Sequence, residues 1–257
     1  MSIVALSGAL AILSVLNLAL VAFIGIDQPS NAPSGTLLYV STFDDDPESS
    51  TDDSLNNQWA QYSGQDSAVI QDGILYLSIG SAGGVFSDLN HPFADLDVEV
   101  LTGWESGDPE VVEAAEVSLM FRYRDVRNFY AFKLRGDGAY RVERLQNGAL
   151  EVLSEWQIAP QALSGLGAFN RLRVVARGDQ LRFFINDQPL LVCPKGADRR
   201  STWNGLRSGT CLSNNRQTAE FLIDSAFKTG KIALGAVAGQ GATGFRVAFD
   251  NVIVLAP

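Results

Sequence analysis

Basic side chains are absent from the first 121 residues, where neither lysine nor arginine occurs. That part of the chain carries 18 aspartates and glutamates, whereas the remainder carries 19 basic and 11 acidic residues, a formal charge of +8. The whole chain has a formal net charge of −10. Because proteins bind phosphate backbones by neutralising them with lysine and arginine, we expect no nucleic-acid partner. The uneven distribution instead favours ion pairs between strands of the acidic and basic parts.

Histidine is almost absent as well. His91 is the single histidine of the chain, which argues against a histidine-rich metal site and against a Ser-His-Asp relay. The sequence also contains neither a CxxC pair nor a GxxxxGKS/T phosphate loop. We therefore expect no cofactor, apart from a possible calcium ion considered below.

Charged side chains are missing from residues 2–26. A helix of this length rises about 36 Å and spans a hydrocarbon core of about 30 Å. The alternative is a cleaved signal peptide, but the segment lacks a basic start and a good small-x-small cleavage site. We predict a transmembrane anchor at 1–27, a Pro/Ser/Gly linker at 28–36 and one folded domain at 37–257. The acidic flank after the anchor suits export, so we predict a single-pass protein of the cell membrane with its C-terminal domain on the extracytoplasmic side.

Asn17 lies near the middle of this apolar segment. A side-chain amide in hydrocarbon is costly unless another helix supplies a hydrogen-bond partner. Ser7 and Ala11 are small residues four positions apart, which allows close approach of a second helix. The pattern predicts contact with transmembrane subunits of a larger complex, although a single tolerated asparagine in a loosely packed helix explains it nearly as well.

The two cysteines, Cys193 and Cys211, enclose a stretch rich in Gly, Arg and Asn. In an oxidising compartment a disulfide closing this loop stabilises the fold by about 3 kcal/mol in the chain-entropy model. Because the predicted anchor implies export, we predict this disulfide. The alternative is two unrelated buried thiols.

From residue 37 onward the apolar residues recur with a period of two, the period of β-strands. Asp-Gly and Asn-Gly pairs at 72–73, 137–138 and 147–148 supply the turn residues that tight hairpins need. We find no convincing helical run after residue 27. The strands that this pattern predicts are 73–79, 95–101, 116–124, 128–136, 139–145, 170–178, 180–187, 230–239 and 244–255. Strands at this spacing predict an all-β sandwich of two antiparallel sheets.

The series of strands resembles the jelly roll of the concanavalin A-like lectin/glucanase superfamily, especially its laminin-G-like and 3-keto-disaccharide-hydrolase-like branch. The stretches that carry the resemblance are DGILYLS, FADLDVEV, LMFRYRDVRNFYAFKLRGDGAYRVERL, NRLRVVARGDQLRFFINDQPL and GKIALGAVAGQGATGFRVAFDNVIV. They extend over nearly all of residues 37–257. The resemblance implies a two-sheet jelly-roll sandwich, but this fold hosts lectins, hydrolases and plain interaction domains.

Glucanases of this superfamily carry Glu-x-Asp-x-Glu on their catalytic strand, and FADLDVEV would place Asp95, Asp97 and Glu99 on those positions. The shorter Asp95 departs from the pattern at the first carboxylate. An amphipathic strand explains the three acids more simply, with Leu96, Val98 and Val100 facing the core. Their cross-strand partners would then be Arg122, Arg124, Lys133 and Arg135. We therefore predict an ordinary strand and no glycosidase activity.

Other ligands have weaker signals. Trp104, near the acidic strand, and Trp203, between the cysteines, are the tryptophans that we expect to offer a ring to a sugar. Some jelly-roll relatives bind Ca²⁺ near their terminal strands, and Asp44, Asp45 and Asp250 could supply hard oxygen ligands. A solvated acidic loop is the commoner explanation of these aspartates.

These observations predict a non-catalytic, membrane-anchored β-sandwich binding module, an accessory or structural subunit docked on a larger membrane complex. The alternative is a surface lectin-like protein that binds carbohydrate. A weak glycoside hydrolase using Asp95 and Glu99 is the second alternative.

Overall fold

The computed structural model describes residues 32–44, 58–81, 83–194, 218–241 and 243–257. Within these ranges no helix is long and apolar enough to cross a membrane. The predicted anchor at 1–27 lies outside the described residues, together with Asn17, Ser7 and Ala11 and most of the linker.

The described part of the chain is almost entirely β-structure. Its strands are β1 (Leu37–Ser41), β2 (Ser67–Gln71), β3 (Ile74–Ile79), β4 (Gly84–Asp88), β5 (Leu96–Ser106), β6 (Glu116–Asp125), β7 (Asn128–Arg135), β8 (Ala139–Gln146), β9 (Ala149–Ile158), β10 (Phe169–Arg177), β11 (Gln180–Ile185), β12 (Gln188–Pro189), β13 (Leu222–Ile223), β14 (Lys231–Val237) and β15 (Phe245–Leu255). A short helix, α2 (Pro109–Ala114), and a 3-10 turn, η3 (Gly239–Gly241), complete the described elements.

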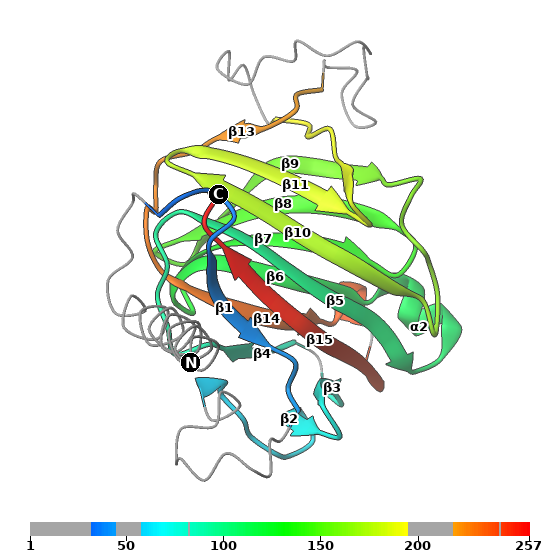
Figure 1. Cartoon of the computed structure of the whole chain (residues 1–257). Coiled ribbons are helices and arrows are strands. Elements are labelled where there is room, and N and C mark those ends of the chain that lie inside the picture. The colour runs from blue at the N-terminus through cyan, green and yellow to red at the C-terminus, as the bar shows by residue number, and fades with distance from the viewer. Residues whose placement is uncertain (1–31, 45–57, 82, 195–217, 242) are drawn as a thin grey trace, which may run out of the picture.

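Two antiparallel sheets form the sandwich that the sequence predicts. The larger sheet has the order β12-β11-β10-β5-β15-β3-β2, with β1 paired to β15 and β13 paired to β11. The smaller sheet has the order β4-β14-β6-β7-β8-β9. Figure 1 shows the two sheets stacked face to face, with β5, β10 and β15 in the front layer and β6–β9 behind them. We call these the nine-stranded and the six-stranded sheet.

Two of the three predicted Asp-Gly and Asn-Gly pairs form two-residue hairpin turns, and at the third only Gly138 has positive φ. Asp72 and Gly73 both have positive φ, 51° and 75°, and so do Asn147 and Gly148, at 52° and 81°. Gln71 pairs with Ile74 and Gln146 with Ala149 across these two-residue turns. Asparagine, aspartate and glycine tolerate this left-handed backbone better than other residues do, which fixes the register of both hairpins.

The core lies between the inner faces of the sheets. Alternation along β5 turns Leu96, Val98 and Val100 inward, where each is fully buried, as the sequence predicts. Phe121, Phe132 and their neighbours supply the opposite layer from the six-stranded sheet. Because successive side chains of a strand point to opposite faces, this arrangement also decides which side chains face outward.

Helix α2 is the one α-helix of the described residues, and the sequence pattern did not predict it. It begins at Pro109, after Asp108, whose side chain accepts a hydrogen bond from the backbone N–H of Glu110. Aspartate at the N-cap and proline in the first turn favour helix initiation. The helix closes one end of the sandwich (Figure 1) and buries Val112.

Candidate functional site

Asp97 and Glu99 lie on the outer face of the nine-stranded sheet and Asp95 lies just before β5, and arginines engage all three acids. Arg173 donates two hydrogen bonds to Asp97, both of 2.6 Å. This bidentate geometry is the strongest form of arginine–carboxylate pairing, and it leaves Asp97 with neither oxygen free for catalysis.

The other two acids are also held in place. Asp95 pairs with the buried Arg122 at 3.3 Å and accepts a hydrogen bond from the backbone N–H of Gly178. Glu99 pairs with Arg171 at 3.1 Å. Burial raises the pKa of the Glu99 carboxyl, and the charge of Arg171 opposes that effect. These contacts favour the amphipathic-strand interpretation over a catalytic strand.

The partners of these acids differ from the predicted ones. Only Arg122 contacts an acid of this strand, whereas Lys133 pairs with Glu116 and Arg135 pairs with Asp137. The reason is topological, because β5 is hydrogen-bonded to β10 and β15 and therefore lies in a different sheet from β6 and β7.

The predicted sugar-binding tryptophans do not form a site in the described structure. Trp104 is fully buried in the core, so it offers no ring to a ligand. Trp203 lies outside the described residues, as does Cys211, and the disulfide stays a prediction. Cys193 itself is buried, and its backbone N–H donates to Ser154 Oγ at 2.8 Å.

Two of the three predicted calcium ligands lie within the described residues, and the third does not. Asp44 and Asp250 lie close enough to interact, since burial raises the pKa of Asp250 and the charge of Asp44 adds to the effect. Asp45 lies outside the described residues. Throughout the described ranges, no group of three or more His, Cys, Asp or Glu side chains could hold a metal ion. Calcium binding by this set stays a prediction.

A depression of about 280 Å³ lies on the outer face of the six-stranded sheet. We call it the trough. Its lining is mostly apolar, with three polar side chains at one end. The apolar lining side chains include Phe86, Met120, Phe129, Ala131, Leu145, Leu150 and Val237, and the polar ones are Ser118, Lys133 and Glu143. Concave sites lined mainly by apolar side chains with a few polar groups are typical of small-molecule binding.

Small residues at the middle of the sheet create the trough. Ser118 on β6 stands opposite Gly235 on β14 and Lys133 on β7. A Cβ on Gly235 would lie 2.8 Å from the Met120 methyl group, so a side chain at this position would displace that methyl group and fill part of the floor. Ala131 continues the low floor on β7.

An apolar cluster separate from the main core borders the trough. Met120 and Tyr123 pack with Phe86 and Phe129, and the Tyr123 ring lies 5.7 Å from Phe86 and 5.8 Å from Phe129. Burial, with the nearby charges of Asp88 and Asp125, raises the pKa of Tyr123 to about 12. The phenol is therefore neutral at physiological pH, which keeps this side of the trough uncharged.

The polar end of the trough is organised by Lys133. Its ammonium group lies 2.9 Å from both Glu116 and Glu143, and Glu143 also pairs with Arg141 at 2.8 Å. Burial lowers the pKa of Lys133, but the two carboxylates outweigh it and leave that pKa raised. The cluster consequently keeps its charges, and it holds them in fixed positions beside the apolar lining.

Ser118 is the unusual member of this polar end. Its side chain is only 2% exposed, and its Oγ has no hydrogen-bond partner among the described residues. A buried hydroxyl without a partner costs about 1–3 kcal/mol. Ser118 lines the trough, but its hydroxyl exposes almost no surface, so a ligand seated there supplies the partner only if the side chains around Ser118 shift.

Trp156 lies next to this cluster on β9. The guanidinium groups of Arg135 and Arg141 stand over its ring, 4.7 and 5.5 Å from the centroid. Arg141 Nε is buried and has no partner in the part of the chain that the structure describes. Trp156 and Arg141 therefore lie beside the trough, whose lining at this end consists of Ser118, Lys133 and Glu143.

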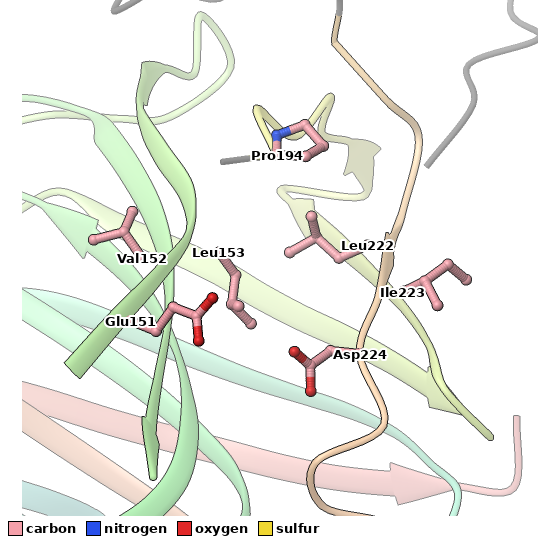
Figure 2. A pocket seen from close by; sticks show the side chains of 7 residues that line it. All are labelled: Glu151, Val152, Leu153, Pro194, Leu222, Ile223 and Asp224. Atoms are coloured by element: carbon pink, nitrogen blue, oxygen red, sulfur yellow. The ribbon is translucent and has the colours of Figure 1, made fainter. Parts of the chain in front are cut away.

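Figure 2 shows a second depression, between β9 and residues 222–224, with a volume of about 90 Å³. The carboxylates of Glu151 and Asp224 point toward each other across it. Arg144 forms ion pairs with both, and Asp224 also accepts a hydrogen bond from the Tyr130 hydroxyl. This network ties the segment around Asp224 to the six-stranded sheet, so we assign it a structural role.

Sequence reasoning missed the residues of the trough. Lys133 was interpreted as a surface partner of the β5 acids, and neither Ser118 nor Glu143 was singled out. The available signal was the row of apolar residues on the outward positions of β6 and β7, where Met120 and Phe129 replace the expected polar side chains. A strand with apolar residues on both faces indicates a second packed or binding surface.

Comparison with known families assigns the chain. It belongs to the family described as the 3-keto-alpha-glucoside-1,2-lyase-like domain, which matches residues 40–254. No curated protein sequence matches the chain.

Several solved structures share the fold. The carbohydrate-binding module CBM66 from Bacillus subtilis has 17% identity and a TM-score of 0.52, over 77% of this chain and 95% of that one. A Bacillus subtilis protein with a galectin-like fold has 12% identity and a TM-score of 0.54, over 87% and 97%. The GH43 protein BlXynB from Bacillus licheniformis has 15% identity and a TM-score of 0.51, over 85% of this chain and 39% of that one. At these identities the likeness establishes the fold and leaves the ligand open.

Proposed function

We propose that the protein binds a carbohydrate in the trough. The observation that carries the proposal is the buried, unpartnered Ser118 hydroxyl, which lies beside the charged Lys133–Glu143 pair at one end of an apolar depression. Sugars combine apolar ring faces with hydroxyl groups that need partners, and this lining offers both kinds of contact. Membership of a family named for a glucoside reaction supports the same class of ligand.

The substitution Ser118→Ala separates binding from folding. Since the hydroxyl has no partner among the described residues, its removal should leave thermal stability unchanged or slightly raised. If a sugar hydroxyl bonds to Ser118 Oγ, its affinity should fall about three- to tenfold, the value of one hydrogen bond. Titration calorimetry with a panel of α- and β-glucosides and their 3-keto forms measures the affinity, and thermal unfolding measures stability.

Thr102→Val is the matched control. Thr102 Oγ1 is also buried without a partner in the described structure, but Thr102 lies on β5 of the other sheet. This variant should behave like Ser118→Ala in unfolding and like the parent protein in binding. Equal affinities for Ser118→Ala and the parent protein would show that Ser118 makes no hydrogen bond to the ligand, and would remove the observation that carries the proposal.

Cleavage of a glycoside is the second candidate function, because the family is named for a 1,2-lyase acting on 3-keto-alpha-glucosides. In such an elimination a base removes the C2 proton next to the ketone, the electrons form a C1–C2 double bond, and the C1–O bond breaks. The departing oxygen takes a proton, so no redox cofactor is consumed. Glu116 lies beside the trough lining, in contact with Lys133, and its described ion pair is with Lys133 alone; it is the carboxylate that we would assign to the proton transfer.

The test of cleavage is direct. The purified chain is incubated with 4-nitrophenyl 3-keto-α-glucoside, and nitrophenol release is compared with a protein-free control. Release that Glu116→Gln abolishes while ligand still binds would establish the lyase. No release above the control would leave binding as the function.

We also propose, from the sequence, that residues 1–27 anchor the sandwich to the cell membrane with the trough on the extracytoplasmic side. Asn17, Ser7 and Ala11 are the positions through which a partner helix of a larger complex would be contacted. Protease accessibility of the sandwich in intact cells tests the orientation. Protection of the domain from external protease would contradict it.

A further inference from the structure

We propose that the apolar end of the trough holds an apolar aglycone, so that the ligand is an aryl or alkyl glycoside. This inference rests on the proposed function, because it assigns the sugar of the ligand to the polar end around Lys133. It goes further in naming the chemical class of the ligand.

The trough is divided along the strands. Lys133 and Ser118 are register partners at the polar end, and Glu143 and Ala131 are partners in the next row. Phe129 and Leu145 follow beyond that, with Leu150 opposite Leu145 on β9. Along β7 and β8 the polar side chains therefore occupy one end of the depression and the apolar ones the other. Phe86, in the same row as Gly235 and Ser118, lines the β4 side of the polar end.

The length of the trough matches two joined rings. Lys133 and Phe129 are four residues apart on β7, which corresponds to about 13 Å along a strand. That is enough for a sugar ring at the polar end and one further ring beyond it. The volume of about 280 Å³ lies near the lower limit of small-molecule sites.

A second sugar is disfavoured at the apolar end. The side chains of Phe129, Leu145 and Leu150 contain neither a donor nor an acceptor, so hydroxyl groups placed against them would lose their hydration without gaining partners. An aryl or alkyl group pays no such cost and gains apolar burial. The lining therefore favours an amphiphilic glycoside over a polysaccharide chain.

Leu150 makes the inference testable without unfolding the protein. Its side chain lines the trough and is 58% exposed, so Leu150→Ser should fold normally. Val126, also 58% exposed, lies at the β6–β7 turn outside the trough and gives the matched control Val126→Ser. Both variants replace an exposed aliphatic side chain by serine.

The experiment compares methyl α-glucoside with 4-nitrophenyl α-glucoside, each also in its 3-keto form. Binding to the full chain is measured by titration calorimetry in a detergent without a sugar head group, since alkyl glycosides belong to the expected class of ligand. We expect the aryl glycoside to bind at least tenfold more tightly, which is about 1.4 kcal/mol. Leu150→Ser should reduce that preference at least threefold and leave the methyl glycoside unaffected, and Val126→Ser should change neither.

Each contrary outcome has a distinct meaning. Equal affinities for methyl and aryl glycosides would overturn the aglycone inference and leave the trough as a sugar site. Failure of every glycoside to bind would overturn both proposals. An aryl preference that Leu150→Ser leaves intact would place the aryl group elsewhere and overturn this inference.

Discussion

Glu99 shows at the residue scale how burial and ion pairing act on the same group in opposite directions. Its spacing from Asp95 matches the carboxylate spacing of a glucanase catalytic strand. The pKa of its carboxyl is raised, as a general acid requires. Burial causes that shift, and Arg171, 3.1 Å away, opposes it. A raised pKa that burial explains is consequently weak evidence for catalysis.

The substitution Glu99→Gln turns this point into a stability measurement. A carboxyl whose pKa is higher in the folded than in the unfolded state destabilises the fold progressively as the pH rises from the unfolded pKa to the folded pKa. The variant has no charge to bury at this position. The melting temperature of Glu99→Gln minus that of the parent protein should therefore increase from pH 4 to pH 7, by up to about 2 °C. A difference that is constant across this range, or that falls with pH, would contradict the account.

At the element scale, helix α2 depends on close approach to a glycine. A Cβ on Gly136 would lie 1.8 Å from the backbone oxygen of Val112, so Gly136→Ala must push the helix away from β7. We expect a loss of more than about 2 kcal/mol, or at least about 4 °C in melting temperature. Gly84→Ala is the control, because the nearest contact of its Cβ would be an ordinary 3.4 Å. A melting temperature of Gly136→Ala equal to that of the parent protein would show that the close approach of Val112 to Gly136 does not matter for stability.

Elements with regular alternation could be predicted from the sequence, and the less regular ones could not. All nine predicted segments are strands in the structure. β9 was missed because its pairing with β8 shifts register twice, after Tyr140 and again after Val142, which breaks the period of two. The cross-strand partners of Asp97 and Glu99 were wrong because strand order depends on contacts distant in sequence.

At the scale of the whole molecule, the charge asymmetry of the chain is explained by ion pairs between its two parts. Within the described ranges, acids from the first 121 residues pair with bases from the remainder: Asp88–Lys231, Asp95–Arg122, Asp97–Arg173, Glu99–Arg171, Glu105–Arg246 and Glu116–Lys133. This expectation from composition is confirmed. The trough was beyond such reasoning, because its lining comes from six strands that only the folded sheet brings together.

The trough contains a methionine whose methyl group can report ligand binding by NMR. The chain has two methionines, Met1 and Met120, and Met120 lines the trough. In an NMR spectrum, protein labelled with ¹³C in the methionine methyl groups therefore gives one resonance from the trough and one from the N-terminus. The first measurement would be a titration of this protein with 4-nitrophenyl α-glucoside. A saturable shift of the Met120 resonance with an unchanged Met1 resonance is the expected result. Binding detected by calorimetry without any change at Met120 would contradict the assignment of the site.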